Sequence, residues 1–186
     1  MAVPGGESLL RNSRKIIGRG VDFIQIREKD LTDRDLFELT RRVVEMARGT
    51  CCRVLVNGRA DIAAAAGAAG VHLTSAGLGI SDVRAWIPKS FIVGVSVHTM
   101  REIQAACVEG ADYVLLGHVF PTSSKESMGS ALGVEFLRRA CRKSSVPILA
   151  LGGITEERIS VVLKAGAAGA AGISLFQNKR FLHYPM

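Results

Sequence analysis

Two glycine-containing segments near the end of the chain have the composition of a phosphate site. In residues 151–156 (LGGITE), the end of an apolar run leads through two glycines into a helix start, and residues 172–174 (GIS) end the next run. Glycine lets backbone N–H groups approach a phosphate closely, and the helix dipole favours negative charge at the first turn. We predict phosphate binding there, with helix capping as the alternative. The N–H groups expected to bind it belong to Gly152, Gly153, Ile173 and Ser174.

A histidine follows another apolar run, in a position suited to proton transfer. His118 comes directly after residues 113–117 (YVLLG). Histidine has an ordinary pKa near neutrality, so its imidazole can both accept and donate a proton at neutral pH. Position alone leaves a catalytic and a structural role open for His118. We interpret His72 and His98 as structural.

Three polar side chains lie at the end of the first apolar run. In residues 23–30 (FIQIREKD), strand alternation directs three polar side chains to one side, where they need water or a ligand. A salt-bridged rim is the alternative. The three residues are Gln25, Arg27 and Lys29.

Two polar loops also follow apolar runs. Residues 121–125 (PTSSK) offer hydroxyls and a lysine for a carboxylate or phosphate, through Thr122, Ser124 and Lys125. A solvated loop explains the same residues. Residues 57–59 (NGR) follow a second run, and a plain turn explains them equally well.

The elements that must position these residues follow a β/α order. Seven short runs rich in Val, Ile and Leu alternate with helical patterns, which is typical of a parallel sheet covered by helices. The predicted strands span residues 21–26, 53–56, 70–73, 91–95, 113–116, 148–151 and 170–174.

Two predicted helices have readable starts. Thr32 with Asp35, and Thr99 with Glu102, have the spacing of a side chain that caps free N–H groups. The first of these helices is expected over residues 33–48, and a further helical pattern covers residues 8–18.

One strand plus one helix is the repeating unit, and an eightfold barrel is its natural closure. Barrels of this type build a phosphate site after strands seven and eight, so a front strand is missing or truncated here. We predict an α/β fold, a TIM (β/α)8-type barrel lacking or truncating its first strand, as one domain over residues 1–186. Whether the chain begins late, the barrel opens, or residues 179–184 fill the edge is left open.

Composition excludes several classes of protein. With 186 residues, 48% hydrophobic and 22% charged, the chain has enough apolar side chain to fold, which excludes intrinsic disorder. Its longest apolar stretch, residues 62–71, is broken by glycines and is shorter than the ~20 residues that cross a bilayer. The first residues lack the apolar core of about 7 to 15 residues of a secretion signal. We therefore expect a cytoplasmic protein without a membrane partner.

The net charge of +7 raises a nucleic-acid hypothesis, because clustered Lys and Arg release counterions from a polyanion. The clusters, however, fall on amphipathic helical patterns, where a solvated outer face explains them. We expect no nucleic-acid partner, and a small anionic ligand remains compatible with the charge. The four cysteines are scattered without zinc or redox spacing, so we expect free thiols and no metal site.

Several phrases together resemble the thiamine phosphate synthase and TenI superfamily over nearly the whole chain. They are QIREKD, VNGRADIA, GVHL, GVSVHTM, GADYVLLGHVFPTSSK, LALGGIT and AGAAGAAGIS. Synthases of that superfamily characteristically have Asn-Asp-Arg after the third strand and an Asp past GVHL, which hold the magnesium of a pyrimidine pyrophosphate. Gly58 and Gly77 stand at those positions here, which removes the hard oxygen ligands that such an ion requires.

The chain resembles the TenI-type thiazole tautomerases more closely, through residues 57–59 (NGR) and 117–120 (GHVF). That resemblance implies an isomerase without a cofactor that aromatises a thiazole carboxylate phosphate, with His118 moving the proton. It places Asn57 in the substrate site, and Ser96, Thr122, Ser124 and Lys125 along the carboxylate or phosphate side. Gln25, Arg27 and Lys29 correspond to the end where synthases meet pyrophosphate.

Other functions remain as alternatives. The chain could be a magnesium-dependent thiamine phosphate synthase, or a non-catalytic binder or regulator of a small phosphorylated thiazole. Sugar-phosphate epimerases share only the phosphate loops and rank last. The resemblance also implies a homodimer.

Overall fold

Strands and helices alternate along the described part of the chain, as the sequence predicts. The computed structural model describes residues 6–74, 77–122 and 130–177. These residues fall into two units, divided between Val93 and Gly94. They contain seven strands, which run parallel to their neighbours within each unit. The α/β prediction is confirmed, while an eightfold barrel as one domain over residues 1–186 stays a prediction.

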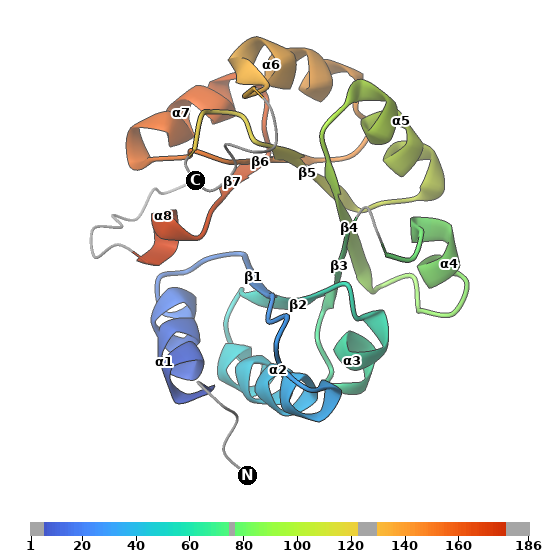
Figure 1. The fold of residues 1–186 in the computed structure, drawn as a ribbon, viewed down its shortest axis with the longest axis vertical. Coiled ribbons are helices and arrows are strands. Elements are labelled where there is room, and N and C mark those ends of the chain that lie inside the picture. Colours follow the sequence, from blue (N-terminus) through green and yellow to red (C-terminus); the bar gives the residue numbers. More distant parts are fainter. Residues whose placement is uncertain (1–5, 75–76, 123–129, 178–186) are drawn as a thin grey trace. The chain divides into compact units, whose positions relative to one another are not determined.

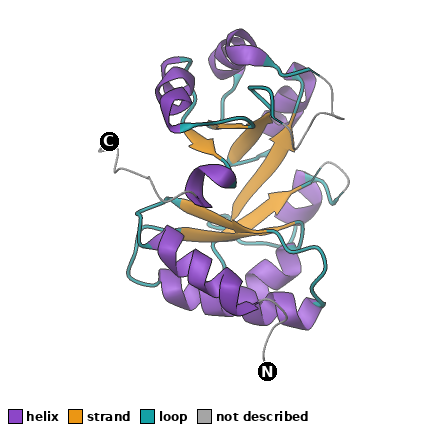
Figure 2. Ribbon diagram, turned by 60° about the vertical axis from the view of Figure 1, so that its left-hand side comes forward, coloured by secondary structure: helices purple, strands orange, loops and turns teal. Residues whose placement is uncertain are grey.

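The first unit holds three paired strands, in the order β1, β2, β3. Figure 2 shows its helices along one face of these strands. Its elements are α1 (Gly6–Ile17), β1 (Phe23–Ile26), α2 (Asp33–Ala47), β2 (Arg53–Asn57), α3 (Ala60–Ala65), β3 (Gly70–Leu73) and α4 (Ile80–Arg84).

The second unit holds four paired strands, in the order β4, β5, β6, β7 (Figure 1). β4 begins just before the division. Its elements are β4 (Ile92–Val97), α5 (Met100–Glu109), β5 (Tyr113–Gly117), α6 (Gly133–Lys143), β6 (Ile148–Leu151), α7 (Glu156–Lys164), β7 (Gly169–Ala171) and α8 (Ser174–Gln177).

The last predicted strand is wrong in its second half. β7 ends at Ala171, and residues 174–177 form the short helix α8 instead of extending the strand. Gly172, which follows β7, has no side chain to pack on a sheet and weakens strand structure. The apolar pattern continues across this glycine, so the sequence alone does not reveal the change of structure.

Both predicted helix caps are confirmed. The Thr32 hydroxyl accepts a hydrogen bond from the Asp35 N–H at 3.2 Å, and the Thr99 hydroxyl accepts one from the Glu102 N–H at 3.2 Å. Each bond satisfies an N–H group that has no partner inside its helix. These caps set the starts of α2 and α5.

Apolar side chains of α2 and of the strands form the core of the first unit. Leu39 and Val43 on α2 are buried, as are Val56 and Val71 on the strands. His72 on β3 is buried among them with 2% of its surface exposed. Burial lowers the pKa of His72 from its ordinary 6.5 to about 4, because a charged imidazole loses its hydration there.

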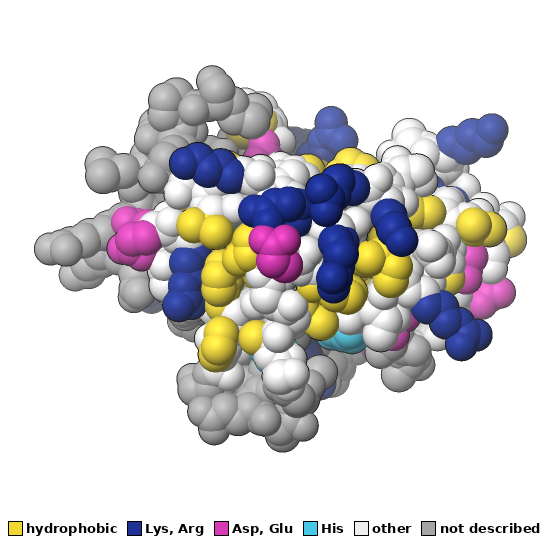
Figure 3. All heavy atoms as spheres, turned by 90° about the horizontal axis from the view of Figure 1, so that it is seen from above, with side chains coloured by type: hydrophobic (Ala, Val, Ile, Leu, Met, Phe, Trp, Pro, Cys, Tyr) yellow, Lys and Arg dark blue, Asp and Glu magenta, His cyan; other side chains and the backbone are white. Residues whose placement is uncertain are grey.

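The basic cluster on α6 lies on an amphipathic helix, as predicted. Leu137 and Ala140 are buried, whereas Arg139, Arg142 and Lys143 are exposed. The view onto this side of the second unit shows Lys and Arg side chains interleaved with hydrophobic ones (Figure 3). Ion pairing and ring stacking occupy part of the cluster, because Arg138 pairs with Glu135 and Arg139 lies 5.8 Å from the Phe136 ring centre.

The described ranges contain no helix that is both long and apolar enough to cross a membrane. All four cysteines lie in these ranges and have free thiols, as expected.

We predict that Leu39→Ala lowers the free energy of unfolding by about 2 to 5 kcal/mol, because it removes buried methyl groups and leaves a cavity. Leu39 is 2% exposed. Leu78→Ala is the control, since Leu78 is 56% exposed and its loss should cost about 0.5 kcal/mol or less. Urea unfolding of both variants measures the difference, and equal losses would contradict the assigned core.

We predict that His72 makes the protein less stable in acid. The pKa of His72 is about 4 in the folded protein and near 6.5 in the unfolded chain, so the unfolded chain binds the proton first as the pH falls. Unfolding free energy should drop between about pH 6.5 and pH 4, by up to about 3 kcal/mol. His72→Leu should flatten this part of the stability profile, measured by urea unfolding at each pH. An unchanged slope in the variant would contradict the assignment.

Candidate functional site

His118 lies directly against the glycine loop that follows β6. β5 and β6 are parallel neighbours with Gly117 opposite Leu151, so the residues after each strand emerge side by side. A Cβ atom on Gly152 would lie only 2.2 Å from Cβ of His118. The structure thus brings the predicted proton-transfer residue and one predicted phosphate loop into contact.

Hydrogen bonds fix the backbone around His118. The Val119 N–H donates to the Leu151 carbonyl at 2.9 Å, which continues the β5–β6 pairing past the strands. The His118 carbonyl accepts a bond of 3.0 Å from the Leu132 N–H. His118 is therefore held from β6 on one side and from the residues before α6 on the other.

A cavity of about 250 Å³ opens at His118. His118 is 6% exposed and is one of the residues that line this cavity. The volume is close to the roughly 300 Å³ at which small-molecule sites begin. The cavity is lined by His98, Gly117, His118, Ser130 and Leu132.

Arg158 on α7 braces the same glycine loop. Its guanidinium donates to the Gly153 carbonyl at 2.6 Å and lies 4.5 Å from the centre of the Phe120 ring. Phe120 follows β5, and its N–H donates to the Gly152 carbonyl at 3.1 Å. The loops after β5 and β6 are thus joined through backbone, guanidinium and ring contacts.

The second predicted amide loop follows the neighbouring strand. β6 and β7 are paired with Leu151 opposite Ala171, so the Gly152 and Gly172 loops begin at the same register. Among the described residues, no backbone carbonyl accepts a hydrogen bond from the N–H of Gly153 or Ile173.

Of the remaining predicted site residues of this unit, two lie in the described part of the chain and two do not. Ser96 lies on β4, half-buried and opposite Leu115 of β5. Thr122 follows β5 and is half-buried. Ser124 and Lys125 lie outside the described residues.

In the first unit, Gln25 and Asn57 are brought together. The Gln25 side-chain amide donates to the Asn57 oxygen at 2.9 Å, linking the ends of β1 and β2. Arg27 and Lys29 follow β1 with exposed side chains.

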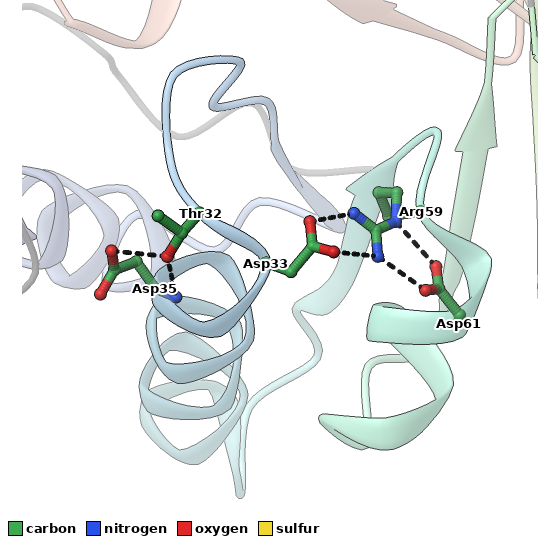
Figure 4. Close-up of polar contacts among 5 residues, drawn as sticks. All are labelled: Thr32, Asp33, Asp35, Arg59 and Asp61. Carbon is green, nitrogen blue, oxygen red and sulfur yellow. Dashed lines mark hydrogen bonds and ion pairs between the residues drawn. The ribbon is translucent and has the colours of Figure 1, made fainter.

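Arg59 joins the starts of α2 and α3 through two carboxylates (Figure 4). It donates to Asp61 at 2.7 Å and to Asp33 at 3.1 Å. Hydrogen bonding to Arg59 lowers the pKa of both carboxyl groups, and the two carboxylates raise the pKa of Arg59. Sequence reasoning missed Asp33, which reaches Arg59 only through the fold.

The resemblance to the synthases implies magnesium ligands at two positions of this unit, and the residues found there do not fit that ion. Gly58 and Gly77 carry no side-chain oxygen, and the nearby carboxylates of Asp33 and Asp61 are engaged by Arg59. Across the described ranges, no three His, Cys, Asp or Glu side chains gather as a metal-binding group.

His98, which the sequence indicates to be structural, contacts the residue that precedes His118. The structure places it beside His118 in the lining of one cavity, and its Nδ1 atom bonds the Gly117 carbonyl. The available signal was its position directly after β4, at the strand end where β/α folds place functional groups.

We predict that Gly152→Ala destabilises the protein and displaces His118. The new methyl group would overlap His118 in a backbone conformation with φ of +94° that alanine rarely adopts. Gly110→Ala is the matched control, because Gly110 has φ of +86° but open space around it. In urea unfolding, Gly152→Ala should lose about 1 to 3 kcal/mol more than the control. Equal losses would contradict the contact.

Known proteins that are similar to this chain are named thiamine-phosphate synthases. Residues 2–176 match the family model described as thiamine monophosphate synthase. A putative thiamine-phosphate synthase 2 of Aquifex aeolicus (strain VF5) is 42% identical, over 92% of this chain and 91% of its own length. A putative thiamine-phosphate synthase of Geobacter sulfurreducens is 41% identical, over 91% of this chain and 80% of its own.

A solved structure shares the fold. Thiamine phosphate pyrophosphorylase from Pyrococcus furiosus matches with a TM-score of 0.83 and 30% identity, over 91% of this chain and 82% of that one. The superfamily identified from the sequence phrases is confirmed, and its tautomerase branch is not distinguished. The chain therefore belongs to the thiamine monophosphate synthase (TMP-TENI) family.

Proposed function

We propose that the protein acts on a phosphorylated thiazole in thiamine biosynthesis and that His118 performs its chemistry. The observation that carries this proposal is the contact of His118 with the Gly152 loop at a cavity. His118 lines the cavity and packs against the Gly152 loop, in which the Gly153 N–H has no backbone acceptor among the described residues. A small anionic substrate held by such N–H groups lies within reach of a proton-transfer group.

The first candidate activity is thiazole tautomerisation. N–H groups of the loops after β6 and β7 bind the phosphate, and the heterocycle lies across the cavity. The His118 imidazole accepts a proton from a ring carbon, and the electrons of that C–H bond enter the ring system. The imidazolium then returns the proton to the exocyclic carbon, so the product is an aromatic isomer and no atom is lost. General acid–base catalysis of this kind contributes about 10²- to 10⁴-fold in rate.

The second candidate is thiamine phosphate synthesis, by coupling a pyrimidine pyrophosphate to thiazole phosphate. The names of the relatives favour it over the first candidate. Against it stand Gly58 and Gly77, together with the engagement of Asp33 and Asp61 by Arg59. We assign no reaction step to magnesium for this reason. A non-catalytic thiazole phosphate binder is the third reading.

We predict that the protein converts the non-aromatic thiazole carboxylate phosphate to its aromatic isomer without added magnesium, followed by ultraviolet absorbance. His118→Ala should lower kcat by about 10²- to 10⁴-fold, while thiazole phosphate still binds. Leu78→Ala is the control, because Leu78 is exposed and its substitution should leave folding and turnover unchanged.

Parallel assays separate the three functions. Coupling of pyrimidine pyrophosphate to thiazole phosphate with magnesium, without aromatisation, would assign the synthase. Binding of thiazole phosphate by folded protein, with turnover in neither assay, would assign the binder. Unchanged turnover in His118→Ala would remove His118 from the mechanism.

A further inference from the structure

His98 is anchored at a fixed position between β4 and α5. It follows Val97, the last residue of β4, and precedes the helix cap Thr99. The Glu102 carboxylate accepts hydrogen bonds from the N–H groups of His98 and Thr99, at 2.5 and 3.1 Å. The first turn of α5 therefore holds the His98 backbone. The imidazole of His98 extends from this fixed backbone.

The imidazole of His98 bonds the residue that precedes His118. Its Nδ1 atom contacts the carbonyl oxygen of Gly117. A carbonyl oxygen only accepts hydrogen bonds, so this contact requires the hydrogen on Nδ1. His98, Gly117 and His118 line the same cavity, so this bond belongs to the site itself.

We propose that His98 is a positioning residue for His118. The Gly117 carbonyl and the His118 nitrogen belong to one planar peptide group, so a bond that holds this carbonyl also fixes the plane from which His118 Cα projects. The bonds after His118 hold its other side, through the Val119 N–H and the His118 carbonyl. Without the His98 bond, the backbone before His118 loses its side-chain anchor. This inference rests on the proposed role of His118.

The direction of the bond suggests a discriminating pair of variants. His98→Ala removes the donor, whereas His98→Asn places a side-chain amide N–H near the former Nδ1 and retains a donor for Gly117. His98→Leu keeps most of the ring volume without a donor, and it replaces His98→Ala if the alanine variant does not fold. Thr99→Ala is the matched control, because it removes the hydroxyl that caps α5 but retains the backbone N–H groups of His98 and Thr99 that bond the Glu102 carboxylate.

We predict that His98→Ala lowers kcat about tenfold, the scale of one lost hydrogen bond, with KM within about twofold. His98→Asn should restore most of kcat, and Thr99→Ala should lower stability without this loss of kcat. Steady-state kinetics in the assay that shows turnover measure both constants. The proposal is overturned if His98→Ala leaves kcat unchanged, or if Thr99→Ala reduces kcat equally.

A second measurement does not require turnover. NMR signals of the His118 ring, assigned by their absence in His118→Ala, should shift in His98→Ala and stay near the wild-type positions in His98→Asn and Thr99→Ala. Unshifted His118 signals in folded His98→Ala would overturn the positioning role. Because these signals are read without substrate, failure of the proposed enzymatic function and failure of this inference are distinguishable.

Discussion

The close approach of the chain after β5 to the chain after β6 is the constraint on which the candidate site depends. Gly117 pairs with Leu151, and backbone bonds continue this pairing as far as Phe120 and Gly152. A side chain at Gly152 would occupy the space of His118. This packing therefore needs a residue without a Cβ atom at position 152, and the proposed approach of a phosphate to the loop would use the same glycine.

In the first unit, charged side chains near the strand ends pair with one another. Arg59 is shared between Asp33 and Asp61, and these contacts tie the starts of two helices together. Carboxylates held by a guanidinium are poor ligands for a metal ion, because the positive charge competes for the same oxygen atoms. The names of the relatives thus favour thiamine phosphate synthesis, whereas the local chemistry favours thiazole tautomerisation. The proposed role of His118 distinguishes these two activities.

Most of the architecture follows from local patterns in the sequence. The alternation of apolar runs and helical patterns predicted seven strands, and the caps at Thr32 and Thr99 formed where the spacing indicated. These features depend on residues within one helical turn or one strand, so a single sequence contains the needed information. The strand predicted across Gly172 failed because apolar composition alone does not distinguish a short helix from a strand end.

The sequence by itself determined the β/α order, the family and the types of group available for chemistry. Only the tertiary structure decided which of those groups meet: His118 with Gly152, Gln25 with Asn57, and Arg59 with Asp33. It also moved His98 from a structural interpretation into the cavity lining. The physical reason is that each contact joins residues from different strands or helices, and strand pairing and register, which set those distances, are absent from any local pattern.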